Sequence, residues 1–284
     1  MTKAAPVRIG VVAPSSRVSP GLGERLAALV ATLPAARRPE IVVHPQCFET
    51  WGHFAGTDEV RARAFIETAN DDRLDALWFG RGGYGSFRLA EAVLAGLGPA
   101  ARRKTYMGYS DAGAMLGALY AAGIGRPVHG PMPADLNRAG GEAAVRRALA
   151  YLTDVDPEAL EPTVPTGRPM AAFNITILAH LIGTPHLPDL AGHVLMLEEV
   201  SEPLYRIDRA LGQITSTPAL RRVAGIMLGR CGDIVANDPE FGQDEEGIAR
   251  DWCARAGIPF LGRADIGHDS GNKVVPFGSW INPG

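Results

Sequence analysis

The first half of the chain alternates short apolar runs with longer stretches in which apolar residues recur every three or four positions. The apolar runs predict strands at residues 7–14, 40–45, 76–80, 104–109 and 126–130. The stretches between them predict helices at residues 21–33, 57–70, 87–97 and 111–122. Strands that alternate with helices form βαβ units around a parallel sheet. The sequence therefore predicts an α/β fold for this half.

A proline-rich segment separates this half from a less regular second half. Residues 154–169 contain four prolines with acidic residues between them, which is typical of a linker. Beyond it we expect strands at 193–200, 223–228, 259–266 and 273–281, and helices at 175–182, 203–215 and 244–256. The sequence thus predicts an N-terminal domain at residues 1–153, the linker, and a smaller C-terminal α/β domain at residues 170–284.

Composition narrows the class of protein. The 284 residues include 28 basic and 31 acidic side chains, so the formal net charge is −3, and no basic block suggests a nucleic-acid surface. The uncharged stretch at 112–125 is interrupted by glycines and is shorter than the roughly 20 apolar residues that span a bilayer. Three distant cysteines fit neither a zinc site nor a disulfide framework. We therefore expect a cytoplasmic protein without membrane or nucleic-acid partners.

Ser110 is a candidate nucleophile because it lies between a predicted strand and a predicted helix. A serine hydroxyl is a weak nucleophile that must be presented to a base, and a sharp strand-to-helix turn flanked by small residues does so. Gly108 and Ala112 are small, although the general motif has glycine at both places. A serine at such a junction is also a common helix N-cap. The local pattern leaves both interpretations open.

A glycine-rich loop, residues 80–85, follows the third predicted strand. Its backbone N–H groups could bind a phosphate, or they could complete an oxyanion hole beside Ser110, or the glycines could simply allow a turn with positive φ. A dinucleotide-binding loop normally follows the first strand. Because adjacent parallel strands end side by side, the neighbouring serine turn favours the oxyanion interpretation.

His268 stands out among seven histidines as a candidate base, since it lies in a polar, glycine-flanked loop after a predicted strand. A solvated loop histidine would look the same. A metal site formed by Asp265, His268 and Asp269 is a further interpretation, but no second cluster of histidines or cysteines supports it.

Glu198 and Glu199 end the apolar run of residues 194–197 and supply the candidate carboxylate. A carboxylate at the end of a buried strand is costly unless it is paired. Strand alternation places the two glutamates on opposite faces, so only one of them can face a given cleft. The order serine, acid, histidine is that of the α/β-hydrolases. The serine belongs to one predicted domain and the other two residues to the next, so the site would lie between them.

These motifs together resemble a known family, the LD-carboxypeptidases, which are serine peptidases that include murein tetrapeptide carboxypeptidase and the microcin C self-immunity peptidases. The resemblance covers residues 7–281 and rests on motifs in a fixed order. They are Ile9–Ser16, Arg81–Gly85, Gly108–Asp111, Leu197–Glu199 followed by Glu202–Arg209, and Gly267-His268 followed by Pro276–Gly278.

The resemblance implies a fold and a mechanism. The N-terminal domain would be a flavodoxin-like or glutamine-amidotransferase-like parallel sheet, and the C-terminal one a swivelling β/α domain. Ser110 would be the nucleophile, His268 the general base and acid, and Glu198 the residue that orients His268. The backbone amides of Gly83 and Asp111 would form the oxyanion hole. Neither metal nor cofactor would be needed, and the protein would be a homodimer.

The resemblance also implies a substrate. It would be a murein tetrapeptide, cut at the amide between an L-centre diamino acid and the terminal D-alanine during cell-wall recycling. Arg81, Tyr84 and Asn174 are candidate substrate contacts, and the residues before Asn174 are Ala-Phe where the family often has Gly-Gly. One alternative is a peptidyl- or aminoacyl-nucleotide of the microcin C type, although the compact chain favours murein. Another is a non-catalytic nucleotide-binding module.

Overall fold

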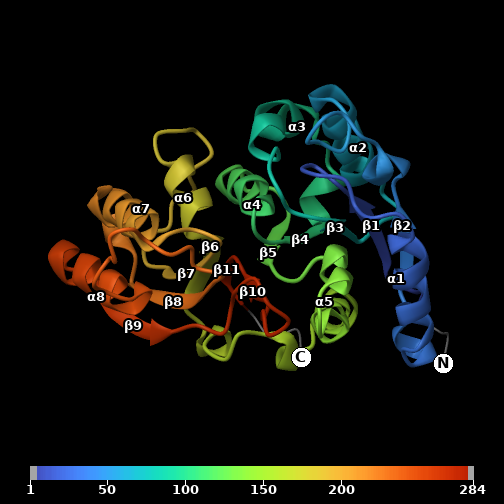
Figure 1. Cartoon of the computed structure of the whole chain (residues 1–284). Coiled ribbons are helices and arrows are strands. Elements are labelled where there is room, and N and C mark those ends of the chain that lie inside the picture. Colours follow the sequence, from blue (N-terminus) through green and yellow to red (C-terminus); the bar gives the residue numbers. More distant parts are fainter. Residues whose placement is uncertain (1–4, 281–284) are drawn as a thin grey trace.

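The computed structural model describes residues 5–280, which form two α/β halves side by side, each with its own sheet (Figure 1). The N-terminal sheet has the order β10-β5-β4-β3-β1-β2. Its strands are β1 (Arg8–Val12), β2 (Glu40–Val43), β3 (Ala76–Phe79), β4 (Thr105–Gly108), β5 (Arg126–His129) and β10 (Val275–Pro276). All neighbouring pairs are parallel except β10 with β5. The expected α/β class is confirmed, and the parallel strands end together at one edge.

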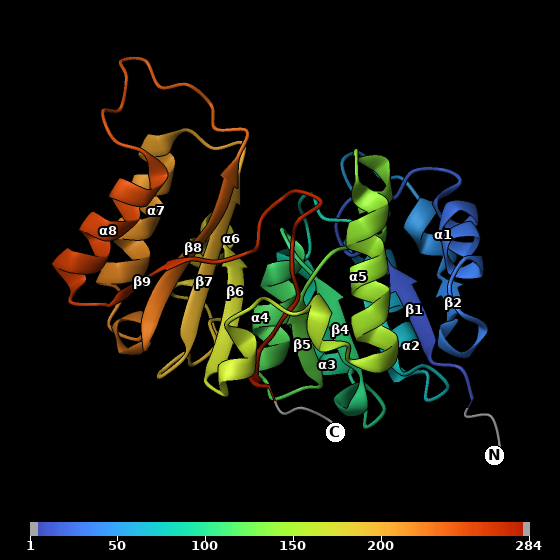
Figure 2. The ribbon, with the colours of Figure 1, turned by 90° about the horizontal axis from the view of Figure 1, so that it is seen from below.

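Helices cover both faces of this sheet (Figure 2). They are α1 (Leu22–Ala31), α2 (Asp58–Asn70), α3 (Ala90–Gly96), α4 (Ala112–Ala121) and α5 (Gly141–Asp154). Helices α2, α3 and α4 share one apolar core, while α1 and α5 pack into the core on the opposite face. Helix α4 is apolar on all sides and almost wholly buried, because it lies between the sheet and the C-terminal half.

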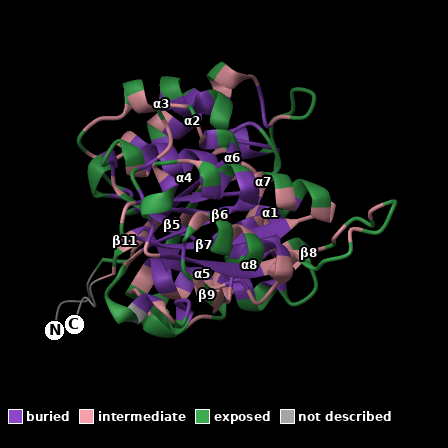
Figure 3. Ribbon diagram, turned by 90° about the vertical axis from the view of Figure 1, so that its left-hand side faces the viewer, coloured by how far each residue is buried: buried purple, intermediate pink, exposed green. Residues whose placement is uncertain are grey.

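The C-terminal sheet has the order β11-β6-β7-β8-β9. Its strands are β6 (Pro169–Asn174), β7 (Val194–Val200), β8 (Gly225–Gly232), β9 (Phe260–Arg263) and β11 (Gly278–Ser279). Helices α6 (Ile175–Leu181), α7 (Leu204–Ser216) and α8 (Glu245–Ala256) pack on the face that shares a core with α4. The inner strands of both sheets are buried, whereas the edge strands β2 and β9 are partly exposed and the outer helix faces are exposed (Figure 3).

The end of the chain joins the two sheets. Strand β10 pairs antiparallel with β5, with Val275 opposite His129, and β11 pairs antiparallel with β6, with Gly278 opposite Met170. The segment between β9 and β10 is therefore fixed at its far end to the N-terminal sheet. This segment contains His268, so the crossing strand determines where that imidazole lies.

Most predicted elements are present within a few residues of their expected ends. Thr57 caps α2, since its hydroxyl accepts a hydrogen bond from the N–H of Val60 at 3.4 Å. Helix α5 and strand β6 were not predicted from the sequence. Strand β6 is rich in alanine and begins at a proline, so its conformation depends on pairing with β7 rather than on propensity.

Two predicted elements differ from the structure. The strand expected at 273–281 is two short strands in different sheets, and the helix expected at 87–97 begins as a single 3₁₀ turn, Phe87–Leu89, before α3. Residues 1–4 and 281–284 lie outside the described residues, so the outer ends of both predicted domains and the last position of the strand expected at 273–281 are not described. The segment predicted as a linker contains two single 3₁₀ turns, Pro157–Ala159 and Val164–Thr166. Within residues 5–280, no helix combines the length and apolar character needed to cross a membrane.

Candidate active site

Ser110 occupies a tight turn between β4 and α4. Its φ is 61°, in the left-handed region that a residue with a side chain adopts at a cost of about 1–3 kcal/mol. The turn is close-packed, because a Cβ on Gly108 would lie 2.9 Å from the Cβ of Ala112 and 3.0 Å from that of Phe79. Such a strained strand-to-helix turn places the serine hydroxyl at the carboxyl edge of a parallel sheet. A serine that only caps a helix does not need this left-handed backbone conformation.

Ser110 lies at a cavity of about 350 Å³ between the two halves of the chain. His268, from the segment after β9, lines the same cavity. The remaining lining residues are Tyr109 and members of the glycine-rich loop and of the segment after β5, among them Arg81, Gly82, Gly83, Met132, Asp135 and Arg138. Folding thus brings together the two candidate groups that the sequence places more than 150 positions apart.

The imidazole of His268 is held by a buried carboxylate. Its Nδ1 atom hydrogen-bonds to Oε2 of Glu198, which comes from β7 and is 0% exposed. Glu199 points to the other side of the strand, where it accepts hydrogen bonds from the side chain of Asn174 and from the N–H and hydroxyl of Thr176, the latter two at 2.9 and 2.7 Å. Strand alternation therefore selects Glu198 as the partner of His268.

Burial and charge act in opposite directions on His268. Burial by itself lowers the pKa of His268, but the negative charge of Glu198 and its hydrogen bond outweigh burial, so the pKa is raised. The Nε2 atom is buried and has no hydrogen-bond partner among residues 5–280. The ring packs against Tyr109, with 4.9 Å between ring centroids. The geometry therefore leaves Nε2 free to exchange a proton, while Nδ1 is held by Glu198.

The glycine-rich loop passes close to the serine. A Cβ on Gly82 would lie 3.1 Å from Oγ of Ser110. Gly83 has a φ of 121°, and a Cβ there would lie 3.0 Å from that of Ser16. In the described part of the chain, the N–H groups of Gly83 and Asp111 donate no hydrogen bond. Unpartnered N–H groups beside a nucleophile are what an oxyanion hole requires.

Two buried side chains brace these loops, and neither role was predicted from the sequence. The carboxylate of Asp111 accepts hydrogen bonds from the Ser15 hydroxyl and, at 2.9 Å, from the N–H of Ser86. Arg61, which is 0% exposed, donates to the carbonyl oxygens of Pro14 and Gly85. The ends of β1, β3 and β4 are thereby tied together. The sequence signal for Arg61 was its position among the apolar residues of the helix predicted at 57–70.

Asp265 and Asp269, which the sequence offered as possible metal ligands beside His268, form ion pairs with an arginine in the structure. Arg230 forms ion pairs with both Asp265, at 2.6 Å, and Asp269. The described residues contain no cluster of histidine, cysteine and carboxylate side chains that could hold a metal ion. The arginine instead holds both ends of the loop that carries His268.

The three candidate substrate contacts have different positions. Arg81 lines the cavity and donates a hydrogen bond to the carbonyl oxygen of Arg17 at 3.2 Å. Tyr84 is 52% exposed and packs beside Phe54, with 6.0 Å between ring centroids, and it is not among the lining residues. Asn174 is also absent from the lining. The oxygen of its side-chain amide caps α6 and the nitrogen donates a hydrogen bond to Glu199, so both polar atoms of the amide already have partners.

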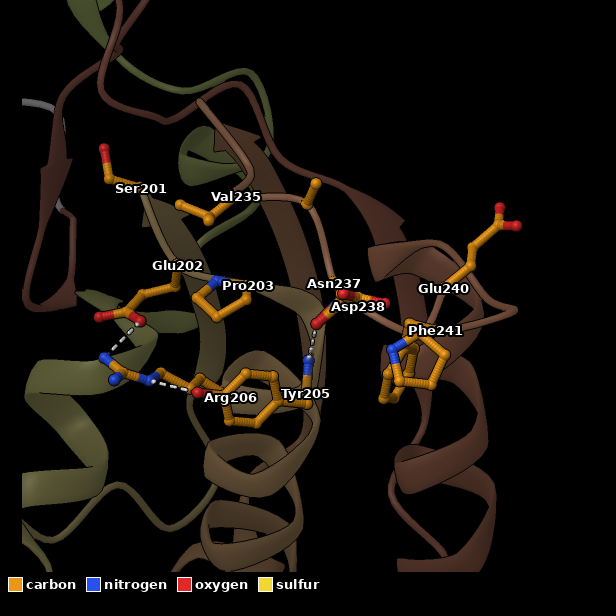
Figure 4. Close-up of a pocket in the computed structure, with 12 residues that line it drawn as sticks. Ser201, Glu202, Pro203, Tyr205, Arg206, Val235, Asn237, Asp238, Glu240 and Phe241 are labelled. Carbon is orange, nitrogen blue, oxygen red and sulfur yellow. Dashed lines mark hydrogen bonds and ion pairs between the residues drawn. The ribbon is translucent and has the colours of Figure 1, made fainter.

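A larger hollow of about 710 Å³ lies elsewhere, between the start of α7 and the loop that follows β8 (Figure 4). It is lined by Ser201, Glu202, Tyr205, Arg206, Val235 and Phe241, among others. Its described lining includes a serine and several carboxylates but no histidine, so it lacks the serine–histidine pair that the smaller cavity contains. The smaller cavity around Ser110 is therefore the candidate active site.

Two family models match the two halves of the chain. The model of the LD-carboxypeptidase N-terminal domain matches residues 9–130, and that of the LD-carboxypeptidase C-terminal domain matches residues 169–282. Among solved structures, the microcin C7 self immunity protein superposes with a TM-score of 0.76 at 17% identity, covering 97% of this chain and 92% of that one. This likeness shows the shared two-domain fold.

Two curated relatives are similar over nearly the whole length. A putative carboxypeptidase of Streptomyces coelicolor is 32% identical over 288 aligned positions, which cover 95% of this chain and 88% of that protein. The murein tetrapeptide carboxypeptidase of Pseudomonas aeruginosa is 27% identical, covering 95% of this chain and 91% of that protein. On these matches, the chain belongs to the LD-carboxypeptidase family.

Proposed function

We propose that this protein is a serine LD-carboxypeptidase. It removes the terminal D-alanine of a murein tetrapeptide by hydrolysing the amide that joins it to the L-centre of a diamino acid. The observation that carries the proposal is one cavity that contains Ser110 in a strained turn and the His268 imidazole bound to buried Glu198. The similarity to the murein tetrapeptide carboxypeptidase of Pseudomonas aeruginosa supports the choice of substrate.

In the proposed mechanism, Oγ of Ser110 attacks the carbonyl carbon of the scissile amide while Nε2 of His268 takes the hydroxyl proton. The N–H groups of Gly83 and Asp111 stabilise the oxyanion of the tetrahedral intermediate. When the intermediate collapses, His268 returns the proton to the leaving nitrogen and free D-alanine departs. Water then attacks the acyl-enzyme with His268 again as base, which restores the serine and releases the shortened peptide.

Each group contributes a distinct part of the rate. Glu198 holds the tautomer of His268 that leaves Nε2 unprotonated and stabilises the imidazolium that forms in the transition state. Removing one oxyanion donor from a comparable site raises the barrier by about 3–4 kcal/mol. Because these donors are backbone N–H groups in braced loops, they are already oriented before the substrate binds.

The proposal is tested by incubating the purified protein with a muramyl tetrapeptide and measuring free D-alanine. We expect release by the wild type and loss of release in Ser110→Ala and His268→Ala. Both variants are checked by circular dichroism for an unchanged fold. Equal release by wild type and Ser110→Ala would contradict the assignment of the nucleophile.

Other substrates are compared in the same assay. A peptidyl-nucleotide of the microcin C type tests the alternative favoured by the fold of the self immunity protein. Hydrolysis of that compound in preference to the tetrapeptide would indicate that the protein is a peptidase of the microcin C self-immunity type. Tight nucleotide binding without hydrolysis of either compound would instead indicate a binding module. The proposed homodimer is checked by light scattering of the eluted protein.

A further inference from the structure

Two arginines contribute permanent positive charge to the cavity that contains Ser110 and His268. Among the described lining residues these are Arg81 and Arg138, and the charge that opposes them there is the carboxylate of Asp135. The lining therefore carries a net charge of +1 when His268 is neutral. Such a cavity suits a ligand with a single negative charge, and a peptide with a free carboxyl terminus brings one to the scissile bond.

Arg138 is fixed in place, unlike most exposed arginines. Its Nη2 atom lies 3.1 Å from Oδ1 of Asp135, and its Nη1 donates a hydrogen bond to the carbonyl oxygen of His268. Asp135 is itself buried and accepts from the hydroxyl of Tyr109 and from the N–H of Met132, both at 2.8 Å. Arg138 is thus tied to the residue before the nucleophile and to the histidine.

The guanidinium keeps unused donors on this rigid frame. Arginine has five N–H donors in a planar fork. The hydrogen bond to His268 uses one of them, and the ion pair with Asp135 engages a second nitrogen. Its side chain is 36% exposed, so the remaining donors are accessible to a ligand. Guanidinium and carboxylate groups pair with charge-assisted hydrogen bonds, often two at a time. Little side-chain entropy would be lost on binding, because Arg138 is already ordered.

We propose that Arg138 binds the terminal carboxylate of the substrate and so limits cleavage to the last residue of the peptide. This inference rests on the proposed carboxypeptidase function. Arg81, one of the candidate substrate contacts, is the other arginine of the lining, but its side chain is exposed and has one hydrogen bond, to Arg17. It would have to become ordered on binding, which costs more conformational entropy. Arg138 is therefore the better positioned of the two.

The test pairs two substrates with two variants. The substrates are a tetrapeptide ending in D-alanine and the same peptide ending in D-alaninamide. The variants are Arg138→Met, which keeps an unbranched side chain but removes the guanidinium group and its charge, and Arg81→Met as the matched control. We expect the wild type to prefer the acid, and Arg138→Met to lose about 10–100-fold in kcat/KM on the acid only, the range for a hydrogen bond to a charged group.

A merely structural role gives a different pattern. If Arg138 only holds the loop of His268, Arg138→Met loses the same factor on both substrates, and this result would overturn the proposal. An equal rate of the wild type on acid and amide would also overturn it. A selective loss on the acid in Arg81→Met, but not in Arg138→Met, would assign the carboxylate to Arg81 instead.

Binding separates this inference from the proposed function. The same two peptides are titrated calorimetrically into Ser110→Ala and into Ser110→Ala with Arg138→Met. Tighter binding of the acid than of the amide, lost in the double variant, supports Arg138 even if the wild type hydrolyses neither peptide. Equal binding of both peptides, or no binding of either, rejects it. Hydrolysis without this preference leaves the proposed function intact and removes only the role of Arg138.

Discussion

The Nδ1 atom of His268 is hydrogen-bonded to Oε2 of Glu198, a residue 70 positions earlier in the chain. Glu198 is near the end of β7 and His268 follows β9, with β8 between these strands in the sheet. A Cβ on Gly229 of β8 would lie 3.0 Å from the Cβ of Glu198 and 2.8 Å from the carbonyl oxygen of Ile266. The absence of a side chain at Gly229 therefore lets the loop of His268 approach the carboxylate.

Replacing Glu198 should affect catalysis far more than replacing its neighbour. In Glu198→Gln the side chain keeps its size, but the negative charge that stabilises the imidazolium is lost. We expect kcat to fall by about 10²–10⁴-fold. Glu199→Gln removes a carboxylate that contacts Asn174 and Thr176, so its effect should appear mainly in stability. Steady-state kinetics and thermal unfolding measure the two effects. The reverse order of kcat losses would contradict the pairing.

The pH profile should report the raised pKa of His268. The base must be unprotonated in the free enzyme, so kcat/KM should rise with pH through a midpoint above 6.5, the ordinary histidine value, and then level off. Removing the charge in Glu198→Gln leaves burial as the larger influence, which lowers the pKa of His268. The acid limb should then move to lower pH while the plateau falls. A midpoint unchanged by this substitution would count against the assignment of the base.

Gly108 should not tolerate a methyl group. In Gly108→Ala the new Cβ would lie 2.9–3.0 Å from Ala112 and Phe79, so either the turn or the strand must shift. We expect a loss of about 1–3 kcal/mol in the free energy of unfolding, together with lower activity. Gly113→Ala is the matched control in α4, since its nearest contact would be an ordinary 3.4 Å from Ile177. That variant should be neutral or gain up to about 1 kcal/mol. Denaturant titration of both variants checks the contrast.

Asn272 should stabilise the loop of His268. Its Oδ1 accepts hydrogen bonds from Nε2 of buried His129 at 3.0 Å and from the N–H of Gly267 at 3.2 Å. Asn272→Ala leaves both buried donors without that acceptor, so we expect a loss of about 1–3 kcal/mol in the free energy of unfolding. Ser270→Ala in the same loop is the control and should change it by less than about 0.5 kcal/mol. Equal losses in both variants would show that the loop as a whole, not this amide, is responsible.

The three cysteines should be unreactive in the folded protein. Burial raises the pKa of Cys47 to about 12 and that of Cys253 to about 11, and it also raises the pKa of Cys231. Because the thiolate is the reactive form, iodoacetamide at pH 8 should label the native protein slowly and leave its activity intact. Denaturant should expose all 3 thiols. Rapid labelling of one cysteine with loss of activity would be inconsistent with a serine nucleophile acting alone.

The alternation of strand and helix patterns was sufficient to predict the α/β class, because hydrophobic periodicity is a local property of the chain. The turn at Ser110 and the glycine-rich loop were identified for the same reason, since each is a short motif between two predicted elements. The conformation of β6 was not predictable, because an alanine-rich segment becomes a strand here through pairing with β7. The split of the last strand depends on two sheets that the sequence pattern cannot place relative to each other.

The sequence by itself determined which chemical groups are available and their order along the chain. The tertiary structure decided which of them meet. It turned Glu198 rather than Glu199 toward His268, and it placed Arg138 beside that histidine although no motif marked it. Contacts between residues from distant segments depend on strand order and on the crossing of β10 to the first sheet. They arise from packing of the whole chain and leave no periodic signal in any one segment.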